Sequence, residues 1–225
     1  MIMGTSRQRV RQIESRLGER YGAAEKPRVD PLDELIHTIL SQNTSDTNRD
    51  RAWSSLREEY GSWEEVLEDG AERLERTIRV AGLAQGKAAT ILRALRWSSD
   101  GGSPSLERLR TMSDEEALRY LTAIKGVGTK TAACVLCFSL GRPVMPVDTH
   151  VHRVSRRLGL VPDRATPERA YEVLNEIVPP ELRFSLHIQL IRHGRETCRS
   201  RTPACPGCVL LDLCPRVGLA GTDAA

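Results

Sequence analysis

Apolar residues recur at helical spacing along most of the chain. The clearest examples are two sets of residues three or four positions apart: Val10, Ile13 and Leu17, and Leu32, Leu35, Ile36, Ile39 and Leu40. This spacing places the apolar side chains on one face of an α-helix, whereas strict alternation, which is typical of a half-buried strand, is hard to find. The pattern predicts an all-α fold.

Signals for helix starts and helix ends agree with this prediction. Four starts carry capping residues: Asp30 before Pro31, Thr166 before Pro167, and the capping-box pairs Ser62/Glu65 and Ser113/Glu116. Glycines that can end a helix divide the chain into helices of ordinary length, at Gly61, Gly82, 101–104, Gly141 and Gly159.

Length and composition narrow the class of protein. A chain of 225 residues is long enough for one large or two modest domains whose core needs no disulfide. No apolar run approaches the roughly 18 residues of a membrane span, and residues 1–20 lack the apolar core of a signal peptide, so we expect a soluble, cytoplasmic protein.

The net charge of +3 says little about partners, but the arginines are unevenly distributed. In the stretch 183–201 a single acid, Glu196, accompanies five arginines: Arg183, Arg192, Arg195, Arg199 and Arg201. This segment predicts a basic patch that could bind nucleic acid, with a solvated helix face as the alternative.

A helix, a tight turn and a second helix are predicted around residues 125–130. Apolar positions at helical spacing stop at Lys125, and a second apolar helix is expected from Thr131 to Leu140. Gly126 and Gly128 flank Val127, and glycines here allow positive φ and a close approach of the backbone amides to a phosphate. Taken alone, a Gly-x-Gly between helices is more often plain turn chemistry.

Lys130 follows this turn near a helix N-terminus. The positive end of the helix dipole disfavours an ammonium there, which favours the neutral, nucleophilic amine. The chain has only four lysines, so a lysine at a place where arginine would serve as a phosphate contact is suggestive. A surface lysine that contacts phosphate is the alternative.

Asp148 lies in the segment Pro146-Val147-Asp148-Thr149-His150, which opens another helix with apolar periodicity. Its position is that of an N-cap, and capping alone explains it. Capping does not exclude chemistry, because a carboxylate kept ionised at this place could also face a reacting sugar.

Residues 121–160, LTAIKGVGTKTAACVLCFSLGRPVMPVDTHVHRVSRRLGL, resemble the helix-hairpin-helix and Gly/Pro-Asp signature of the endonuclease III superfamily of DNA glycosylases and AP lyases. The resemblance implies that Lys130 attacks the sugar C1′ and Asp148 assists. It also implies DNA contacts by the hairpin residues and by His150. Two helical parts are expected, with a DNA cleft between them: a six-helix barrel at 23–142, and a part made of 1–22 and 143–225.

Four cysteines near the end of the chain have the spacing Cys-x6-Cys-x2-Cys-x5-Cys: Cys198, Cys205, Cys208 and Cys214. Structural zinc usually takes two close pairs, whereas an iron-sulfur cube accepts one ligand per corner and tolerates uneven loops. The spacing also resembles the family's [4Fe-4S] loop, so we expect that cluster, with zinc as the alternative and disulfides as a remote third. Cys134 and Cys137 lie in an apolar helix and are interpreted as core residues.

By resemblance, two loops, at residues 40–46 and 81–84, would enter the duplex and fill the gap left by an extruded base. The resemblance implies that Gln42 or Asn43 contacts the base left without its partner. It implies that Leu83 is an apolar wedge in the stack. The prototype of the family has glutamine where Asn43 aligns. The alternatives are an ordinary helix end for Gln42 and Asn43, and a contact after a glycine C-cap for Leu83.

Together these features predict a monomeric, bifunctional DNA glycosylase and AP lyase of base excision repair. It would remove oxidised pyrimidines such as thymine glycol from damaged double-stranded DNA, without a membrane association. Alternatives are a monofunctional adenine glycosylase, whose catalytic glutamate would align near Thr38, or a mismatch thymine or uracil glycosylase. A non-catalytic iron-sulfur DNA-binding module is disfavoured, because binding requires neither Lys130 nor Asp148.

Overall fold

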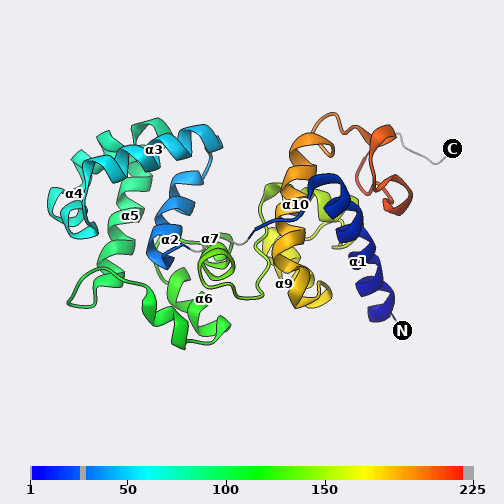
Figure 1. The fold of residues 1–225 in the computed structure, drawn as a ribbon, viewed down its shortest axis with the longest axis horizontal. Coiled ribbons are helices and arrows are strands. Elements are labelled where there is room, and N and C mark those ends of the chain that lie inside the picture. Colours follow the sequence, from blue (N-terminus) through cyan, green and yellow to red (C-terminus); the bar gives the residue numbers. More distant parts are fainter. Residues whose placement is uncertain (1, 26–28, 220–225) are drawn as a thin grey trace. The chain divides into compact units, whose positions relative to one another are not determined.

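A computed structural model describes residues 2–25 and 29–219, and in that part of the chain every regular element is a helix (Figure 1). This confirms the all-α prediction. The α-helices are α1 (Ile2–Tyr21), α2 (Pro31–Ser41), α3 (Asp46–Glu59), α4 (Trp63–Thr77), α5 (Ala84–Ser99), α6 (Asp114–Thr122), α7 (Thr129–Cys134), α8 (Thr149–Arg157), α9 (Pro167–Ile177) and α10 (Arg183–Glu196).

Shorter helical turns connect these elements. They are η1 (Arg79–Ala81), η2 (Glu107–Thr111), η3 (Val135–Ser139), η4 (Pro180–Leu182), η5 (Cys205–Gly207) and η6 (Leu211–Leu213). None of the helices in the described ranges has the length and apolar character needed to cross a lipid bilayer.

The chain divides into two compact units. The central unit is Pro27–Arg142, and the terminal unit combines Met1–Lys26 with Pro143–Ala225. The central unit therefore contains α2 to α7, and the terminal unit brings the N-terminal helix together with the segment that carries the four cysteines. From the sequence, the junctions are predicted after residues 22 and 142.

The central unit is organised around α2, which packs against α3, α5, α7 and η3. Its apolar stripe, Leu35, Ile36, Ile39 and Leu40, is fully buried. Asp30 caps the helix by accepting from the amide of Leu32 at 2.8 Å, and Pro31 occupies the first helical position, as predicted. Helices α4 and α5 lie side by side, as do α6 and α7 (Figure 1).

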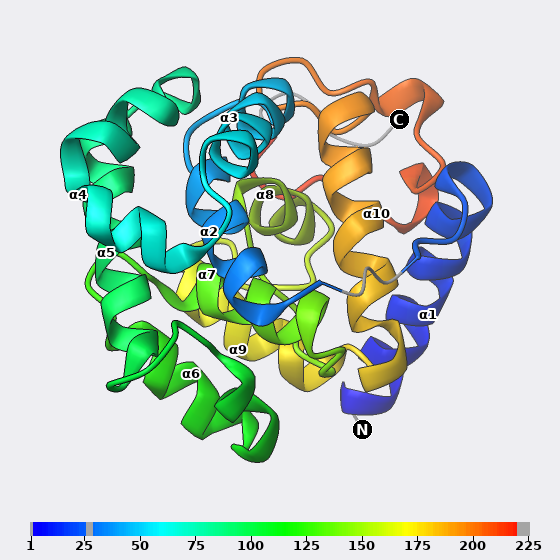
Figure 2. The same cartoon turned by 60° about the vertical axis from the view of Figure 1, so that its left-hand side comes forward.

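In the terminal unit, α10 packs against α1 on one side and α8 on the other (Figure 2). Val10, Ile13 and Leu17 of α1 are fully buried in one hydrophobic cluster with the apolar residues of α8 and α10. The apolar positions at residues 10–17 thus form the face of α1 that packs against α8 and α10, in the C-terminal part of the chain.

Most of the capping predictions are confirmed. Thr166 accepts from the amide of Arg169, and Ser113 with Glu116 forms a complete capping box. The box at Ser62 is half formed, because the Glu65 carboxylate accepts from the amide of Gly61.

The helix after the hairpin begins earlier than the sequence predicts. It begins at Thr129 instead of Thr131 and widens into a π-helical turn, η3, before Gly141 ends it with a φ of 66°.

Candidate active site and cysteine pocket

The hairpin between α6 and α7 is built around Gly126. This residue has a φ of 103°, and a Cβ placed on it would lie 2.6 Å from Oγ1 of Thr90. Glycine is therefore required for both backbone conformation and space. The expectation for Gly128 is not met, because its φ is −94° and a Cβ would meet nothing within 4 Å.

Helix α5 braces this turn. Arg93 donates from Nε to the carbonyl oxygen of Lys125 at 2.8 Å and from Nη2 to Thr90 Oγ1 at 2.8 Å. Val127 is buried, and its amide donates to the Ile124 carbonyl at 2.9 Å. The hairpin backbone is thus held by side chains beneath it, while Gly126 and Gly128 remain exposed.

Lys130 is the second residue of α7 and is half-buried. Helix α2 packs against this helix, and Gln42 at the end of α2 donates from Nε2 to Thr131 Oγ1 at 3.4 Å. The candidate nucleophile therefore lies on a short helix that is fixed at its first turn by a side chain from α2.

Sequence reasoning missed a buried carboxyl in α2. Glu34 is only 7% exposed and accepts a hydrogen bond from Thr38 Oγ1 at 2.9 Å. Burial raises the pKa of Glu34 to about 7, although this hydrogen bond and the positive charges of Lys130 and Arg49 act in the opposite direction. The available signal was an acid one helical turn before Thr38, next to the apolar stripe.

Asp148 belongs to the terminal unit and caps α8, where its Oδ1 accepts from the amide of Val151 at 2.7 Å. The predicted N-cap is therefore confirmed. His150, in the first turn of the same helix, is half-buried, and its Nδ1 lies 3.1 Å from Nη2 of Arg153. Arg153 also donates to the carbonyl of Gly194, which ties this turn to α10.

The two loops nominated for DNA share an unusual backbone. Asn43 has a φ of 51° and Leu83 a φ of 49°, and both are in the left-handed region that non-glycine residues rarely adopt. Leu83 is 67% exposed, so its side chain is not packed against the glycine-capped end of η1. Strained residues of this kind concentrate at functional sites.

One arginine of the expected basic patch has a structural role instead. Arg183 donates to the carbonyl oxygens of Val178, Pro143 and Asn175, which fixes the start of α10. It is half-buried, whereas Arg192, Arg195, Arg199 and Arg201 are exposed. The basic patch is therefore limited to the last turns of α10 and the loop that follows.

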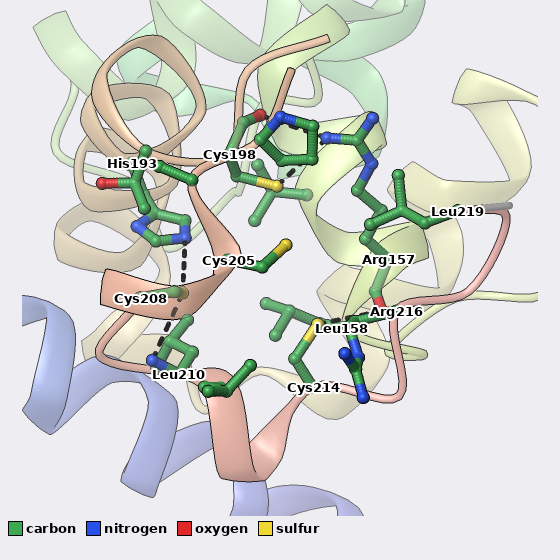
Figure 3. A pocket seen from close by; sticks show the side chains of 15 residues that line it. Arg157, Leu158, His193, Cys198, Cys205, Cys208, Leu210, Cys214, Arg216 and Leu219 are labelled. Carbon is green, nitrogen blue, oxygen red and sulfur yellow. Dashed lines mark hydrogen bonds between the residues drawn. The ribbon is translucent and has the colours of Figure 1, made fainter. Parts of the chain in front are cut away.

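The cysteines at 198, 205, 208 and 214 line one pocket of the terminal unit (Figure 3). Arg157 lies at its edge, donating to Cys198 Sγ at 3.3 Å and to the carbonyls of Arg199 and Ser200. The amide of Leu210 donates to Cys208 Sγ at 3.4 Å. These donors would stabilise thiolates, whereas burial raises the pKa of the Cys208 and Cys214 thiols.

His193 borders the same pocket. Burial lowers its pKa to about 4, so the imidazole is neutral at physiological pH. Its Nδ1 lies 3.1 Å from the Tyr21 hydroxyl and its Nε2 3.6 Å from Cys208 Sγ. Tyr21 is the last residue of α1, so these contacts link the N-terminal helix through His193 to the cysteines.

Metal centres differ in how far apart their ligands lie. Within residues 2–25 and 29–219, no three Cys, His, Asp or Glu side chains are grouped so as to hold a single metal ion. A cube of four irons binds one thiolate per iron, so its ligands stand farther apart than the ligands of one tetrahedral zinc. The pocket brings together four thiols, which is the number of ligands that such a cube takes.

Cys134 and Cys137 are 2% and 1% exposed in the helix after the hairpin, which confirms their interpretation as core residues.

Comparison with known proteins relates this geometry to a family. The profile of the HhH-GPD superfamily base excision DNA repair proteins matches residues 36–180. Endonuclease III of Thermotoga maritima is 35% identical over 188 residues, which cover 82% of this chain and 83% of that protein. An Arabidopsis thaliana protein proposed to be a DNA glycosylase is 40% identical over 83% of this chain, which spans 65% of that relative's length.

A solved structure gives the same result. The structure of a trapped endonuclease III-DNA covalent intermediate matches with a TM-score of 0.81 and 30% identity, covering 93% of this chain and 96% of that one. The chain therefore belongs to the HhH-GPD superfamily of base excision DNA repair proteins, in the endonuclease III family.

Proposed function

We propose that this protein is a bifunctional DNA glycosylase and AP lyase of base excision repair. It removes oxidised pyrimidines, such as thymine glycol, from duplex DNA and then cleaves the strand at the abasic site. The observation that carries the proposal is Lys130, an amine at the start of the helix that follows a glycine-dependent hairpin, in a chain of the endonuclease III family.

Lys130 is the nucleophile of this reaction. Its neutral amine attacks C1′ of the deoxyribose, the C1′–N1 bond breaks, and the electron pair leaves with the base, which takes up a proton. Loss of a proton from the new C–N linkage and opening of the sugar ring give a Schiff base. Abstraction of a proton from C2′ then expels the 3′ phosphate by β-elimination.

Asp148 supports the positive charge that develops on the sugar or assists proton transfer. Its Oδ1 accepts from the Val151 amide, which fixes the carboxyl group at the start of α8.

The remaining site residues bind DNA. The hairpin Gly126-Val127-Gly128 receives a backbone phosphate through the amides of its two exposed glycines. His150 contacts the strand from the first turn of α8. Gln42 or Asn43 meets the base opposite the lesion, and Leu83 fills the gap in the stack. The exposure of Leu83 is that expected of a wedge.

The four cysteines at the end of the chain hold a [4Fe-4S] cluster. The cluster's contribution is structural, since it fixes the fold of the loop that carries the exposed Arg199 and Arg201. Arg157 and the amide of Leu210 hold the thiolate sulfurs by hydrogen bonds. The protein acts as a monomer on cytoplasmic, chromosomal DNA.

Borohydride trapping tests the proposal. Duplexes with different lesions are incubated with protein and borohydride, which reduces the Schiff base and leaves the protein attached to DNA. Lys130→Gln should give no adduct while retaining DNA binding, because the hairpin amides and arginines remain. Lys125→Gln is the matched control, since it removes the other lysine of the hairpin and should still be trapped.

Mass analysis of the peptide attached to DNA identifies the amine. A peptide that lacks Lys130 would end the assignment. Base release from a lesion duplex without any trapped species would instead indicate a monofunctional glycosylase.

A further inference from the structure

The ammonium group of Lys87 lies in the interior of the central unit. Lys87 is 3% exposed, and its Nζ donates to two backbone carbonyls, that of Leu40 at 2.8 Å and that of Ala81 at 2.8 Å. The first acceptor is 47 residues away in sequence, at the end of α2, and the second is the last residue of η1. One side chain therefore connects two separate segments.

Both acceptors lie at the start of the loops nominated for DNA. Leu40 comes three residues before Asn43, and Ala81 comes two residues before Leu83. The backbone amide of Lys87 also donates to the carbonyl of Leu83 at 3.0 Å. Lys87 thus contacts both loops through its side chain and holds Leu83 through its main chain.

These loops contain two of the four non-glycine residues with positive φ among the described residues, Asn43 and Leu83. Such conformations persist only where the surrounding contacts determine them. Both residues are exposed, so their own side chains do not provide the restraint. Hydrogen bonds to the carbonyls at the base of each loop can provide it.

The charge of Lys87 is not balanced by an acid. Its pKa is lowered by burial, and no carboxylate in the part of the chain described by the structure offsets this effect. A methionine would fill similar space without the cost of burying an ammonium. What the ammonium adds is two directed hydrogen bonds from one atom to two loops.

We propose that Lys87 is a positioning residue. It holds the two loops in a fixed position relative to each other, so that Asn43 and Leu83 enter the duplex together. The inference rests on the proposed function, because it assigns these loops to the opening of the base stack. It predicts that Lys87 matters for duplex DNA, where a stack must be opened, and much less for a single strand.

The experiment compares cleavage of an abasic site in duplex DNA with cleavage of the same site in a single strand. Lys87→Met should lower the duplex-to-single-strand rate ratio roughly 10- to 100-fold, because small displacements of positioning groups have effects of that size. Lys87→Arg keeps donors and charge and should restore much of the ratio. Leu95→Ala, in the buried face of the same helix, should lower Tm and leave the ratio unchanged.

A second measurement checks that Lys87 acts through the loops. In the Lys87→Met and Leu83→Gly double variant, the loss of duplex activity should be smaller than the product of the two single losses. Equal losses on both substrates in Lys87→Met, or independent effects in the double variant, would make Lys87 a residue of the core only. If Lys87→Met does not fold, Lys87→Gln is measured in the same way.

Failure of the proposed function would be recognised separately. In that case the wild-type protein would cleave neither abasic substrate, or Lys130→Gln would cleave both at the wild-type rate. If the wild type cleaves and this cleavage depends on Lys130, the duplex-to-single-strand rate ratio of the Lys87 variants tests only how the two loops are held.

Discussion

Asp148 accepts a hydrogen bond from the backbone amide of Val151, three residues further along, and so caps the helix that carries His150. An amide oxygen can replace this acceptor, whereas the negative charge is lost. Asp148→Asn should therefore fold normally but remove bases about 100-fold more slowly or worse in single-turnover assays. Asp148→Ala, which loses the cap as well, should in addition be destabilised by about 1 kcal/mol. An Asp148→Asn protein with wild-type base release would leave Asp148 with the capping role only.

The two glycines of the hairpin should differ in how far each tolerates a side chain. In Gly126→Ala the new methyl group would meet Thr90 Oγ1 at 2.6 Å, at a φ of 103°. We expect a loss of about 1–3 kcal/mol in urea unfolding and weaker binding of duplex DNA by fluorescence anisotropy. Gly128→Ala, which meets nothing within 4 Å, should unfold like the wild type. Equal stability of the two variants would contradict this account of the turn.

Glu34 should make the stability of the central unit depend on pH. Its pKa is about 7 in the folded protein against an ordinary value of 4.5, so the folded state binds the extra proton between these values. Stability should be highest below about pH 4.5 as far as this group is concerned, and should fall as pH rises through 7. The difference is of the order of 3 kcal/mol. In Glu34→Gln, unfolding measured at pH 5 and pH 8 should differ less than in the wild type.

The cysteine pocket predicts a coloured protein. Purified protein should be yellow-brown, with iron and sulfide in roughly equal amounts. Cys205→Ser should lose iron, solubility and DNA affinity together, because the cluster holds a loop that carries exposed arginines. Cys134→Ala changes a cysteine of the core and should keep both iron and colour. Colourless protein that contains zinc would overturn the cluster assignment.

Local signals predicted much of this structure, since capping and apolar periodicity involve residues within four positions of each other. Asp30, Ser113, Asp148 and Thr166 each cap the helix expected of them. The errors arise where partners are distant in sequence. Arg183 was assigned to a basic patch because its acceptor at Pro143, 40 residues away, cannot be read from the chain.

The same limit applies to the candidate site. Motifs suffice to nominate Lys130 and the cysteines as site residues. Lys87 carries no such signal, because its partner at Leu40 is 47 residues away. Glu34 was passed over because an acid beside an apolar stripe is normally solvated, and only packing shows that its carboxyl is buried.

Because α1 packs against α10, the two units must fold in a definite order during synthesis. The central unit is one continuous stretch and can fold as soon as it has emerged, whereas the apolar face of α1 must wait for residues 143–196. At roughly 5 to 20 residues per second, the delay is of the order of ten seconds or more. During this interval Val10, Ile13 and Leu17 lack their native partners, and the apolar face of the nascent helix stays exposed to water.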